Sequence, residues 1–193
     1  MNVVAILLAA GSASRFGSDK LLHALPHEVP IAVQAARHLQ AVFGKEIHVV
    51  VRPEARELAD KLRTEGCKLV ECANAAEGMG ASLACAVQAA GEAEGFVVAL
   101  ADMPFIRSST IAAVRDALAS GAPLAAPYFR ARRGHPVGIS AQFRHELAAL
   151  KGDEGARKII SANEKSLLKI PVGDPGVLRD IDTPGDLAPP LVV

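Results

Sequence analysis

Residues 3–20 of the chain read VVAILLAAGSASRFGSDK. Residues 3–10 are apolar without interruption, which is typical of a β-strand that is buried on both faces of a parallel sheet. A polar loop of small residues follows at once and carries Arg15 and Lys20. Small residues let backbone N–H groups approach a ligand closely, and a concave run of such groups binds anions. The stretch therefore predicts either a polyphosphate-binding loop or a plain turn with charges at its surface.

Two common phosphate-binding loops do not fit this stretch. The dinucleotide-binding fingerprint G-x-G-x-x-G requires a glycine where the chain has Ala13. The Walker A loop requires a lysine directly after its last glycine, whereas Ser18 and Asp19 separate Gly17 from Lys20. A dinucleotide-dependent oxidoreductase is therefore a disfavoured alternative.

The rest of the chain repeats the alternation of short apolar runs and helical patterns. We expect helices over 31–43, 53–65, 79–90, 108–118, 142–150 and 154–162, and strands over 47–51, 67–71, 96–101, 124–129, 137–140, 167–172 and 177–181. Ser108 or Ser109 is expected to cap the helix over 108–118. This order predicts a single α/β domain over residues 1–193, with helices on both faces of a mainly parallel sheet.

Composition narrows the class of protein. The chain has 193 residues and a net charge of zero, which argues against a general nucleic-acid binder. We expect no membrane span and a cytoplasmic location, because no apolar run is long enough and no basic segment precedes residues 3–10. Cys67, Cys72 and Cys85 show neither disulfide nor zinc spacing, so reduced structural thiols are expected.

Two aspartates are candidates for a metal site, because ligands of α/β sheets bind beyond the carboxyl ends of the strands. Asp102 ends the apolar run 96–101, and Mg²⁺ prefers carboxylate oxygens that it shares with substrate phosphates. An Asp next to the Met103-Pro104 pair is, on its own, more often a turn former. Asp182 is the second candidate, although Asp182 or Thr183 also suits the cap of a helix that begins at Pro184.

Six motifs, in order along the chain, resemble the MobA/MocA-like nucleotidyltransferases, which include the molybdenum cofactor cytidylyltransferases and guanylyltransferases. The motifs are Leu8-Ala9-Ala10-Gly11 with Arg15, Gly17 and Lys20; Gly78-Met79-Gly80-Ala81-Ser82-Leu83; Ala101-Asp102-Met103-Pro104; Gly134-His135-Pro136-Val137-Gly138; Gly152-Asp153-Glu154-Gly155-Ala156-Arg157; and Asp180-Ile181-Asp182-Thr183-Pro184 with Asp186 and Leu187. They cover nearly the whole chain. The resemblance implies a three-layer α/β/α, Rossmann-like fold of the nucleotide-diphospho-sugar transferase (GT-A-like) type. It also implies Mg²⁺-dependent transfer of a nucleoside monophosphate from an NTP to an acceptor phosphate, with release of pyrophosphate.

The resemblance also implies roles for individual residues. Lys20 would contact the nucleotide phosphates, Arg15 the leaving group, and Asp102 the Mg²⁺ ion, so these three are the expected catalytic residues. Asp182 would be the second metal ligand, as in the similar Asp-Thr-Pro of related sugar-nucleotide synthetases. The expected nucleotide-binding residues are Leu8, Ala9, Ala10, Gly11, Lys20 and Ser82.

His135 and Arg157 are the expected acceptor-binding residues, although a single histidine in a loop is more often structural. Arg130, Arg132 and Arg133 form either a further acceptor pocket or a solvated hairpin.

Single residues of the motifs bear on the choice of substrates. Ala10 stands where guanylyltransferases usually have glycine, which leaves less room for a purine and favours CTP. Met103 resembles the guanylyl enzymes instead, so GTP is the alternative. The expected acceptor is molybdopterin, with sugar or isoprenoid phosphates as alternatives, since residues 26–31 depart from the family pattern. A role in delivering the cofactor to a molybdoenzyme or its chaperone is a further alternative.

Overall fold

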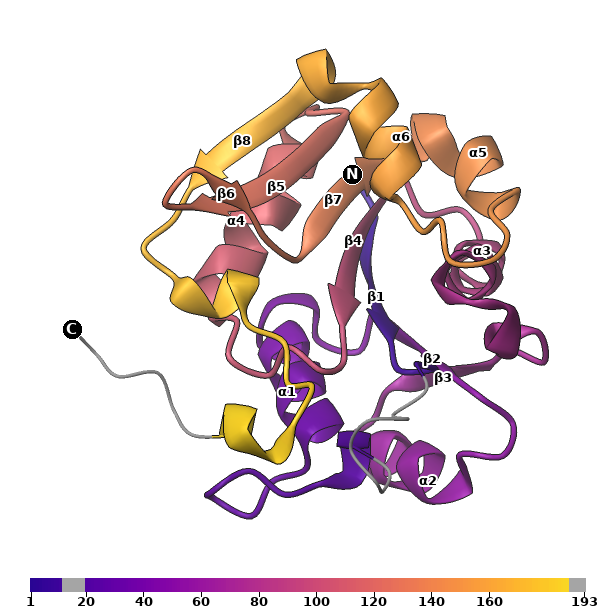
Figure 1. The fold of residues 1–193 in the computed structure, drawn as a ribbon. Coiled ribbons are helices and arrows are strands. Elements are labelled where there is room, and N and C mark those ends of the chain that lie inside the picture. The colour runs from indigo at the N-terminus through magenta and orange to yellow at the C-terminus, as the bar shows by residue number, and fades with distance from the viewer. Residues whose placement is uncertain (12–19, 188–193) are drawn as a thin grey trace.

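The computed structural model describes residues 1–11 and 20–187. Within these residues, one sheet has the strand order β3-β2-β1-β4-β7-β5-β6, and β8 pairs with β5 (Figure 1). The strands are β1 (Val3–Leu8), β2 (Ile47–Val51), β3 (Lys68–Glu71), β4 (Gly95–Leu100), β5 (Leu124–Phe129), β6 (Arg132–Arg133), β7 (Val137–Ser140) and β8 (Leu167–Pro171).

The first half of the sheet is parallel and the second half is mixed. Strand β1 pairs in parallel with β2 and β4, and β2 pairs in parallel with β3. Strand β7 then runs antiparallel between β4 and β5, whereas β8 is parallel to β5. The predicted α/β class and mainly parallel sheet are confirmed, and the antiparallel β7 is the feature that the order of elements did not predict. The carboxyl ends of β1, β2, β3 and β4 consequently meet at one edge.

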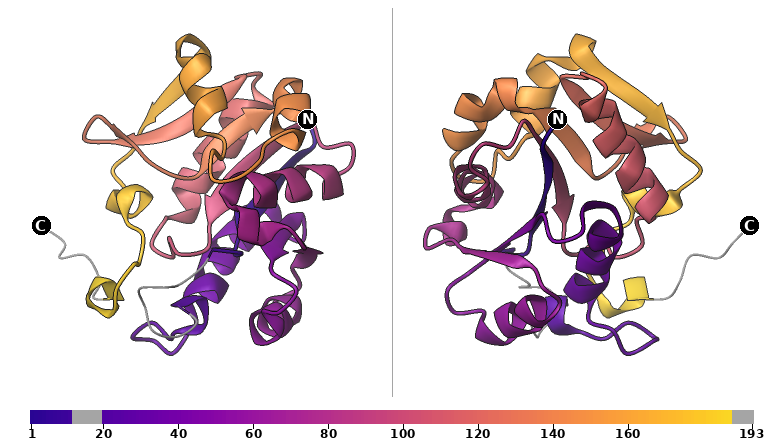
Figure 2. Two further views of the ribbon diagram at one scale, coloured as in Figure 1. Left: turned by 45° about the vertical axis from the view of Figure 1, so that its right-hand side comes forward. Right: turned by 180° about the vertical axis from the view of Figure 1, so that it is seen from behind.

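Helices cover both faces of the sheet and complete the three predicted layers (Figures 1 and 2). Buried side chains of α1 (Ile31–Phe43), α2 (Arg56–Thr64) and α4 (Ser108–Ala119) pack on one face. Those of α3 (Met79–Ala89), α5 (Arg144–Ala148) and α6 (Arg157–Ala162) pack on the other. Among the described residues, none of the helices is both long and apolar enough to cross a bilayer.

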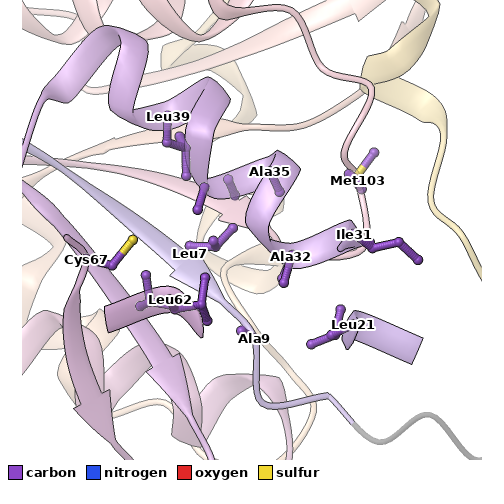
Figure 3. Packing of buried hydrophobic residues seen from close by; sticks show 14 of the residues in the cluster. Leu7, Ala9, Leu21, Ile31, Ala32, Ala35, Leu39, Leu62, Cys67 and Met103 are labelled. Carbon is purple, nitrogen blue, oxygen red and sulfur yellow. The ribbon is translucent and has the colours of Figure 1, made fainter. Parts of the chain in front are cut away.

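The uninterrupted apolar run of β1 serves both cores, because successive side chains of a strand point to opposite faces. Ala5, Leu7 and Ala9 pack towards α1 and α2, as Figure 3 shows for Leu7 and Ala9, whereas Ile6 and Leu8 pack towards α3. Leu7 has no exposed surface, so its truncation to alanine is expected to cost roughly 2–5 kcal/mol of stability. This burial fixes the strand whose end begins the predicted phosphate loop.

Several predicted elements differ in type or extent from those of the structure. The expected strand over 177–181 is absent, and Pro175–Leu178 form a 3₁₀ turn instead. The expected helix over 142–150 is split into a 3₁₀ turn at Ala141–Phe143 and the short helix α5. The helices expected from residues 53 and 154 begin only at Arg56 and Arg157.

The predicted cap of α4 is wrong. Asp174 takes this role from a distant part of the chain, where its carboxylate accepts hydrogen bonds from the Arg107 N–H (2.9 Å) and the Thr110 hydroxyl (2.8 Å). Ser108 lies inside the helix and donates to the His38 carbonyl oxygen. A buried carboxylate from another element takes this position because it accepts hydrogen bonds from one backbone N–H and one hydroxyl at the start of the helix.

The cysteines also depart from the expectation of three reduced thiols. Cys72, directly after β3, and Cys85, on α3, form a disulfide with a Cα–Cα distance of 6.1 Å. Cys67 is free and buried, and burial raises the pKa of its thiol to about 11. Sequence spacing gave no sign of this pair, because the two residues meet through the packing of α3 beside β3.

Candidate active site

A cavity of about 450 Å³ opens at the edge where the parallel strands end. It lies beyond the carboxyl ends of β1, β2 and β4 and against the start of α3, which is the usual ligand position in such sheets. The residues that line it are Leu8, Ala10, Gly11, Lys20, Leu21, Arg52, Ala75, Ala76, Gly78, Met79, Ser82, Leu100, Asp102, Asp153 and Asp182.

Three of the predicted site residues meet at one end of this cavity. The Lys20 Nζ atom lies 3.0 Å from Oδ2 of Asp102 and 3.2 Å from Oδ1 of Asp182. The Lys20 side chain is 12% exposed, whereas those of Asp102 and Asp182 are 26% and 51% exposed. One ammonium group therefore bridges two carboxylates that face the cavity.

Three separate elements hold this cluster in place. Asp102 follows β4, whose ladder is extended by the hydrogen bond from the Ala101 N–H to the Leu8 carbonyl oxygen. Lys20 begins a 3₁₀ turn that is anchored by Leu21, a residue of the core beside α1 (Figure 3). The backbone N–H of Ile181 donates to the Asp102 carbonyl oxygen, which brings Asp182 beside β4.

The Asp182 carboxylate makes no capping contact with the turn that begins at Pro184 among the described residues, and its role as a metal ligand stays a prediction. Asp186 takes the capping contacts, since its carboxylate accepts hydrogen bonds from both backbone N–H groups of Asp182 and Thr183 and from the Thr183 hydroxyl. The Asp182 carboxylate is thus directed to Lys20.

The surroundings of Asp102 and Lys20 shift the pKa values of these two groups. Burial raises the pKa of Asp102 above its usual value, although the neighbouring Lys20 opposes this rise. Burial also acts to lower the pKa of Lys20, but the charges and hydrogen bonds of Asp102 and Asp182 outweigh it, so that this pKa is raised. Lys20 is therefore fully charged near neutral pH.

The carboxylate pair fits a hard divalent cation such as Mg²⁺. Two carboxylates converge on one positive charge, which the Lys20 ammonium supplies in this structure. Within the described part of the chain, no three His, Cys, Asp or Glu residues form a metal-binding group. A Mg²⁺ ion needs only one or two carboxylates when substrate phosphates complete its shell, so Asp102 and Asp182 are a sufficient set.

The predicted nucleotide-binding residues are brought together, with one difference. Leu8, Ala10, Gly11 and Ser82 line the cavity with Lys20. The Ala9 side chain instead packs in the core near Leu21 (Figure 3), so a nucleotide contact is open only to its backbone. Arg15 lies outside the described residues, so its role at the leaving group stays a prediction.

Glycines let the start of α3 pack tightly against the turn at residues 152–153. The Gly80 N–H donates to the Gly152 carbonyl oxygen (2.7 Å). Gly78 has a φ of +129°, and a Cβ atom there would lie 2.2 Å from the Asp153 carboxylate. Asp153 consequently reaches the cavity wall, which sequence reasoning did not anticipate.

A second cavity of about 250 Å³ adjoins the first, with which it shares Leu8, Met79, Leu100 and Asp153. Both predicted acceptor residues, His135 and Arg157, line it, together with Arg133 and an apolar wall that includes Leu83 and Val137. Burial and the charge of Arg133 lower the pKa of His135 to about 4, so its ring is neutral at pH 7. Arg130 and Arg132 do not line this cavity; they belong to the β5–β6 hairpin, as one of the two sequence interpretations proposed.

Arg52 is a cavity residue that the motifs did not reveal. It follows β2 directly, and its guanidinium group points to the Gly11 carbonyl oxygen, at 3.4 Å. The sequence did contain a signal for Arg52, because this residue directly follows the apolar run 47–51. Ligands of α/β sheets bind beyond the carboxyl ends of such strands.

Comparison with known proteins agrees with this geometry. The model of the MobA-like NTP transferase domain matches residues 5–167. The chain is 29% identical to the nicotine blue oxidoreductase of Paenarthrobacter nicotinovorans over 190 residues, which covers 94% of the chain and 92% of that protein. It is also 29% identical to the purine catabolism protein PucB of Bacillus subtilis over 195 residues, with the same coverage.

Solved structures show the same fold. Rv0371c of Mycobacterium tuberculosis superposes with a TM-score of 0.84 at 24% identity, over 96% of this chain and 94% of that one. A second structure of Rv0371c, described as a complex with manganese, has a TM-score of 0.78 at 22% identity, over 96% of each chain. The molybdopterin-guanine dinucleotide biosynthesis protein A of Archaeoglobus fulgidus has a TM-score of 0.67 at 19% identity, over 95% of this chain and 94% of that one.

Proposed function

The chain belongs to the MobA-like NTP transferase domain family and is a nucleotidyltransferase, and we propose that it transfers CMP from CTP to the phosphate of molybdopterin. Pyrophosphate is the second product. GTP is the alternative donor, and another phosphorylated molecule is the alternative acceptor. The observation that carries this proposal is the convergence of Asp102, Asp182 and Lys20 at one end of the 450 Å³ cavity.

Asp102 and Asp182 would hold a divalent cation, which we propose to be Mg²⁺, together with the triphosphate of the nucleotide. When bound, this ion would neutralise charge on the transferring and leaving phosphate oxygens. A manganese complex of the structurally similar Rv0371c is consistent with such a site.

Lys20 would exchange its contacts with the two carboxylates for the phosphate oxygens of the nucleotide. Its raised pKa keeps the ammonium charged at neutral pH, as this role requires. Arg15 would add a second positive charge near the departing pyrophosphate, a role that rests on the sequence resemblance.

The transfer itself needs no general base. An acceptor phosphate has a second pKa of about 6, so it is already largely ionised at pH 7. One of its oxygens attacks the α-phosphorus, the new P–O bond forms, and the bond to the β-phosphate bridging oxygen breaks with release of pyrophosphate. The protein's part is to hold the acceptor in line and to stabilise the charge that develops.

The second cavity is the proposed acceptor site. It adjoins the first one and combines an apolar wall with Arg157 at its exposed rim, which suits a flat ring system that bears a phosphate. The neutral His135 ring fits an uncharged heterocycle better than an anion. Molybdopterin has both features, and a structurally similar protein is named for molybdopterin-guanine dinucleotide biosynthesis.

CTP is the preferred donor in this proposal because Ala10, which lines the nucleotide cavity, leaves less room for a purine than the glycine usual in guanylyltransferases. A cytoplasmic location and delivery of the product to a molybdoenzyme or its chaperone are parts of the same proposal. Neither a membrane nor a nucleic acid is a proposed partner.

One relative is named an oxidoreductase, which makes a dinucleotide-dependent reaction the competing function. In a dinucleotide-binding fold, a helix begins directly after the glycine loop that follows the first strand. Among the described residues, the first α-helix that follows β1 begins at Ile31, and the carboxylates of Asp102, Asp153 and Asp182 line the cavity. These two features support nucleotidyl transfer over hydride transfer.

The test is pyrophosphate release by the purified protein with each of four NTPs, Mg²⁺ and molybdopterin or another phosphorylated acceptor. We expect release that depends on CTP, on the acceptor and on Mg²⁺. A clear preference for GTP would replace CTP as donor. Oxidation of NADH or NADPH without any pyrophosphate release would establish the competing function instead.

A further inference from the structure

We propose that Arg52 reads the base of the bound nucleotide and selects cytosine or guanine over uracil and adenine. This inference rests on the proposed function, since it requires an NTP in the 450 Å³ cavity. Arg52 belongs to none of the motifs of the family resemblance, and its position follows from the topology of the sheet.

The strand order places Arg52 and the carboxylate cluster at opposite ends of the cavity. Arg52 follows β2 and Asp102 lies just beyond β4, with β1 between these two strands. Neighbouring strands lie about 4.8 Å apart, so the two strand ends are separated by roughly 10 Å. A nucleotide whose phosphates lie at Asp102 and whose ribose lies over Gly11 would place its base at Arg52. The ribose would then fill the space between the phosphate end and the base end of the cavity.

The guanidinium group of Arg52 lacks strong partners in the described structure. Its Nη2 atom lies 3.4 Å from the Gly11 carbonyl oxygen, and its Nη1 atom lies 3.7 Å from the Glu54 carboxylate. Both distances exceed the usual 2.7–3.2 Å of an N–H···O hydrogen bond. The Nε atom is buried and has no hydrogen-bond partner among the described residues.

This incomplete pairing makes the side chain available for a ligand. The Arg52 side chain is only 29% exposed, so water satisfies little of its hydrogen-bonding capacity. Beyond β3, the neighbouring wall of the cavity is formed by Ala75 and Ala76, whose side chains carry no hydrogen-bonding atoms. A base that enters this end of the cavity would therefore meet the guanidinium group as its directional partner.

The chemistry of guanidinium restricts which bases match. Arginine carries only N–H donors, and its planar fork pairs with two adjacent acceptors. Cytosine presents such a pair in N3 and O2, and guanine presents one in N7 and O6. Uracil interposes an N–H donor between its two carbonyl groups, and the amino group of adenine adjoins its N7 and N1 acceptors. Arg52 thus favours CTP and GTP, and Ala10 then favours the smaller of these two bases.

The experiment compares kcat/KM for CTP, GTP, UTP and ATP in the wild type, Arg52→Lys and Arg52→Ala. Lysine keeps the charge but loses the planar fork. We expect the CTP-to-UTP ratio of kcat/KM to fall at least about fivefold in both variants, because a bidentate pair discriminates by at least that factor. Arg56→Ala, at the start of α2 and outside the cavity, is the matched control with an unchanged ratio.

Three outcomes would contradict base selection by Arg52 or the proposed function. An equal loss of kcat/KM for all four nucleotides in Arg52→Ala would mean that Arg52 holds phosphates, and this result overturns base selection. An unchanged ratio in folded variants, shown by an unchanged circular dichroism spectrum, overturns it as well. A wild type that releases no pyrophosphate from any NTP contradicts the proposed function itself, so the two failures are distinguishable.

Discussion

The backbone N–H of Ile181 donates a 2.9 Å hydrogen bond to the carbonyl oxygen of Asp102. This bond joins the segment after β8 to the end of β4. It brings the carboxylate of Asp182 to the Lys20 ammonium group that Asp102 also contacts. The metal and phosphate end of the site therefore depends on a contact between parts of the chain that are far apart in sequence.

Replacing the carboxylate of Asp102 tests its proposed part in the chemistry. We expect Asp102→Asn and Lys20→Ala each to lower kcat at least about a hundredfold, because preorganised charges at the transferring phosphate contribute that much. Thermal unfolding should remain cooperative in both variants. Asp60→Asn, on the exposed face of α2, is the control with full activity. Wild-type rates in Asp102→Asn would remove this residue from the mechanism.

Two neighbouring glycines test whether the segment after β8 positions Asp182. A Cβ atom at Gly176 would lie 2.2 Å from the Phe105 carbonyl oxygen, whereas one at Gly173 would meet no atom within 4 Å. We expect Gly176→Ala to destabilise the protein by about 1–3 kcal/mol and to lower activity, because the segment must move away from β4. Gly173→Ala should stay within about 0.5 kcal/mol of the wild type. Urea unfolding measures both, and equal stabilities would show that this contact is unimportant.

The neutral state of His135 predicts a dependence of stability on pH. Its pKa is about 4 in the folded protein and about 6.5 when unfolded, chiefly because of burial. Between these values the unfolded chain binds more protons, so the free energy of unfolding rises with pH. This contribution is complete above pH 6.5 and is lost as the pH falls towards 4, with a loss of up to about 3 kcal/mol.

Unfolding by urea at several pH values, in the wild type and in His135→Asn, measures this contribution. The slope between pH 4 and 6.5 should be smaller in the variant, although burial also lowers the pKa of His38 and His48 and leaves part of the slope. Identical slopes in the two proteins would contradict the assignment.

The disulfide between Cys72 and Cys85 closes a loop that contains Ala75, Ala76 and Gly78 of the cavity wall. We expect its reduction to lower stability by about 3 kcal/mol, the value typical of a loop near this length. Thiol counting under denaturing, non-reducing conditions should find one free cysteine, Cys67. Cys67→Ala is the control whose stability should still respond to reductant. Three free thiols in the air-oxidised protein would disprove the pairing.

Much of the fold follows from local patterns in the sequence. The apolar runs of β1 and β4 predicted buried parallel strands because each strand must fill two cores at once. The site was predicted through motifs at strand ends, and Lys20, Asp102 and Asp182 do meet there.

Other features depend on packing between distant segments, which no local pattern records. Asp174 caps α4 in place of Ser108 or Ser109 because tertiary contact brings its carboxylate to the first turn. The insertion of β7 between β4 and β5, the disulfide and the under-paired guanidinium group of Arg52 have the same origin.

Isothermal titration of CTP in the presence and absence of Mg²⁺ tests the central claim most directly, namely that Asp102 and Asp182 hold a metal–triphosphate complex with Lys20. We predict that Mg²⁺ raises the affinity of the wild type for CTP at least about tenfold, because the ion bridges carboxylates and phosphates. The double variant Asp102→Asn, Asp182→Asn should lose this increase. The same CTP affinity with and without Mg²⁺ in both proteins would contradict the account.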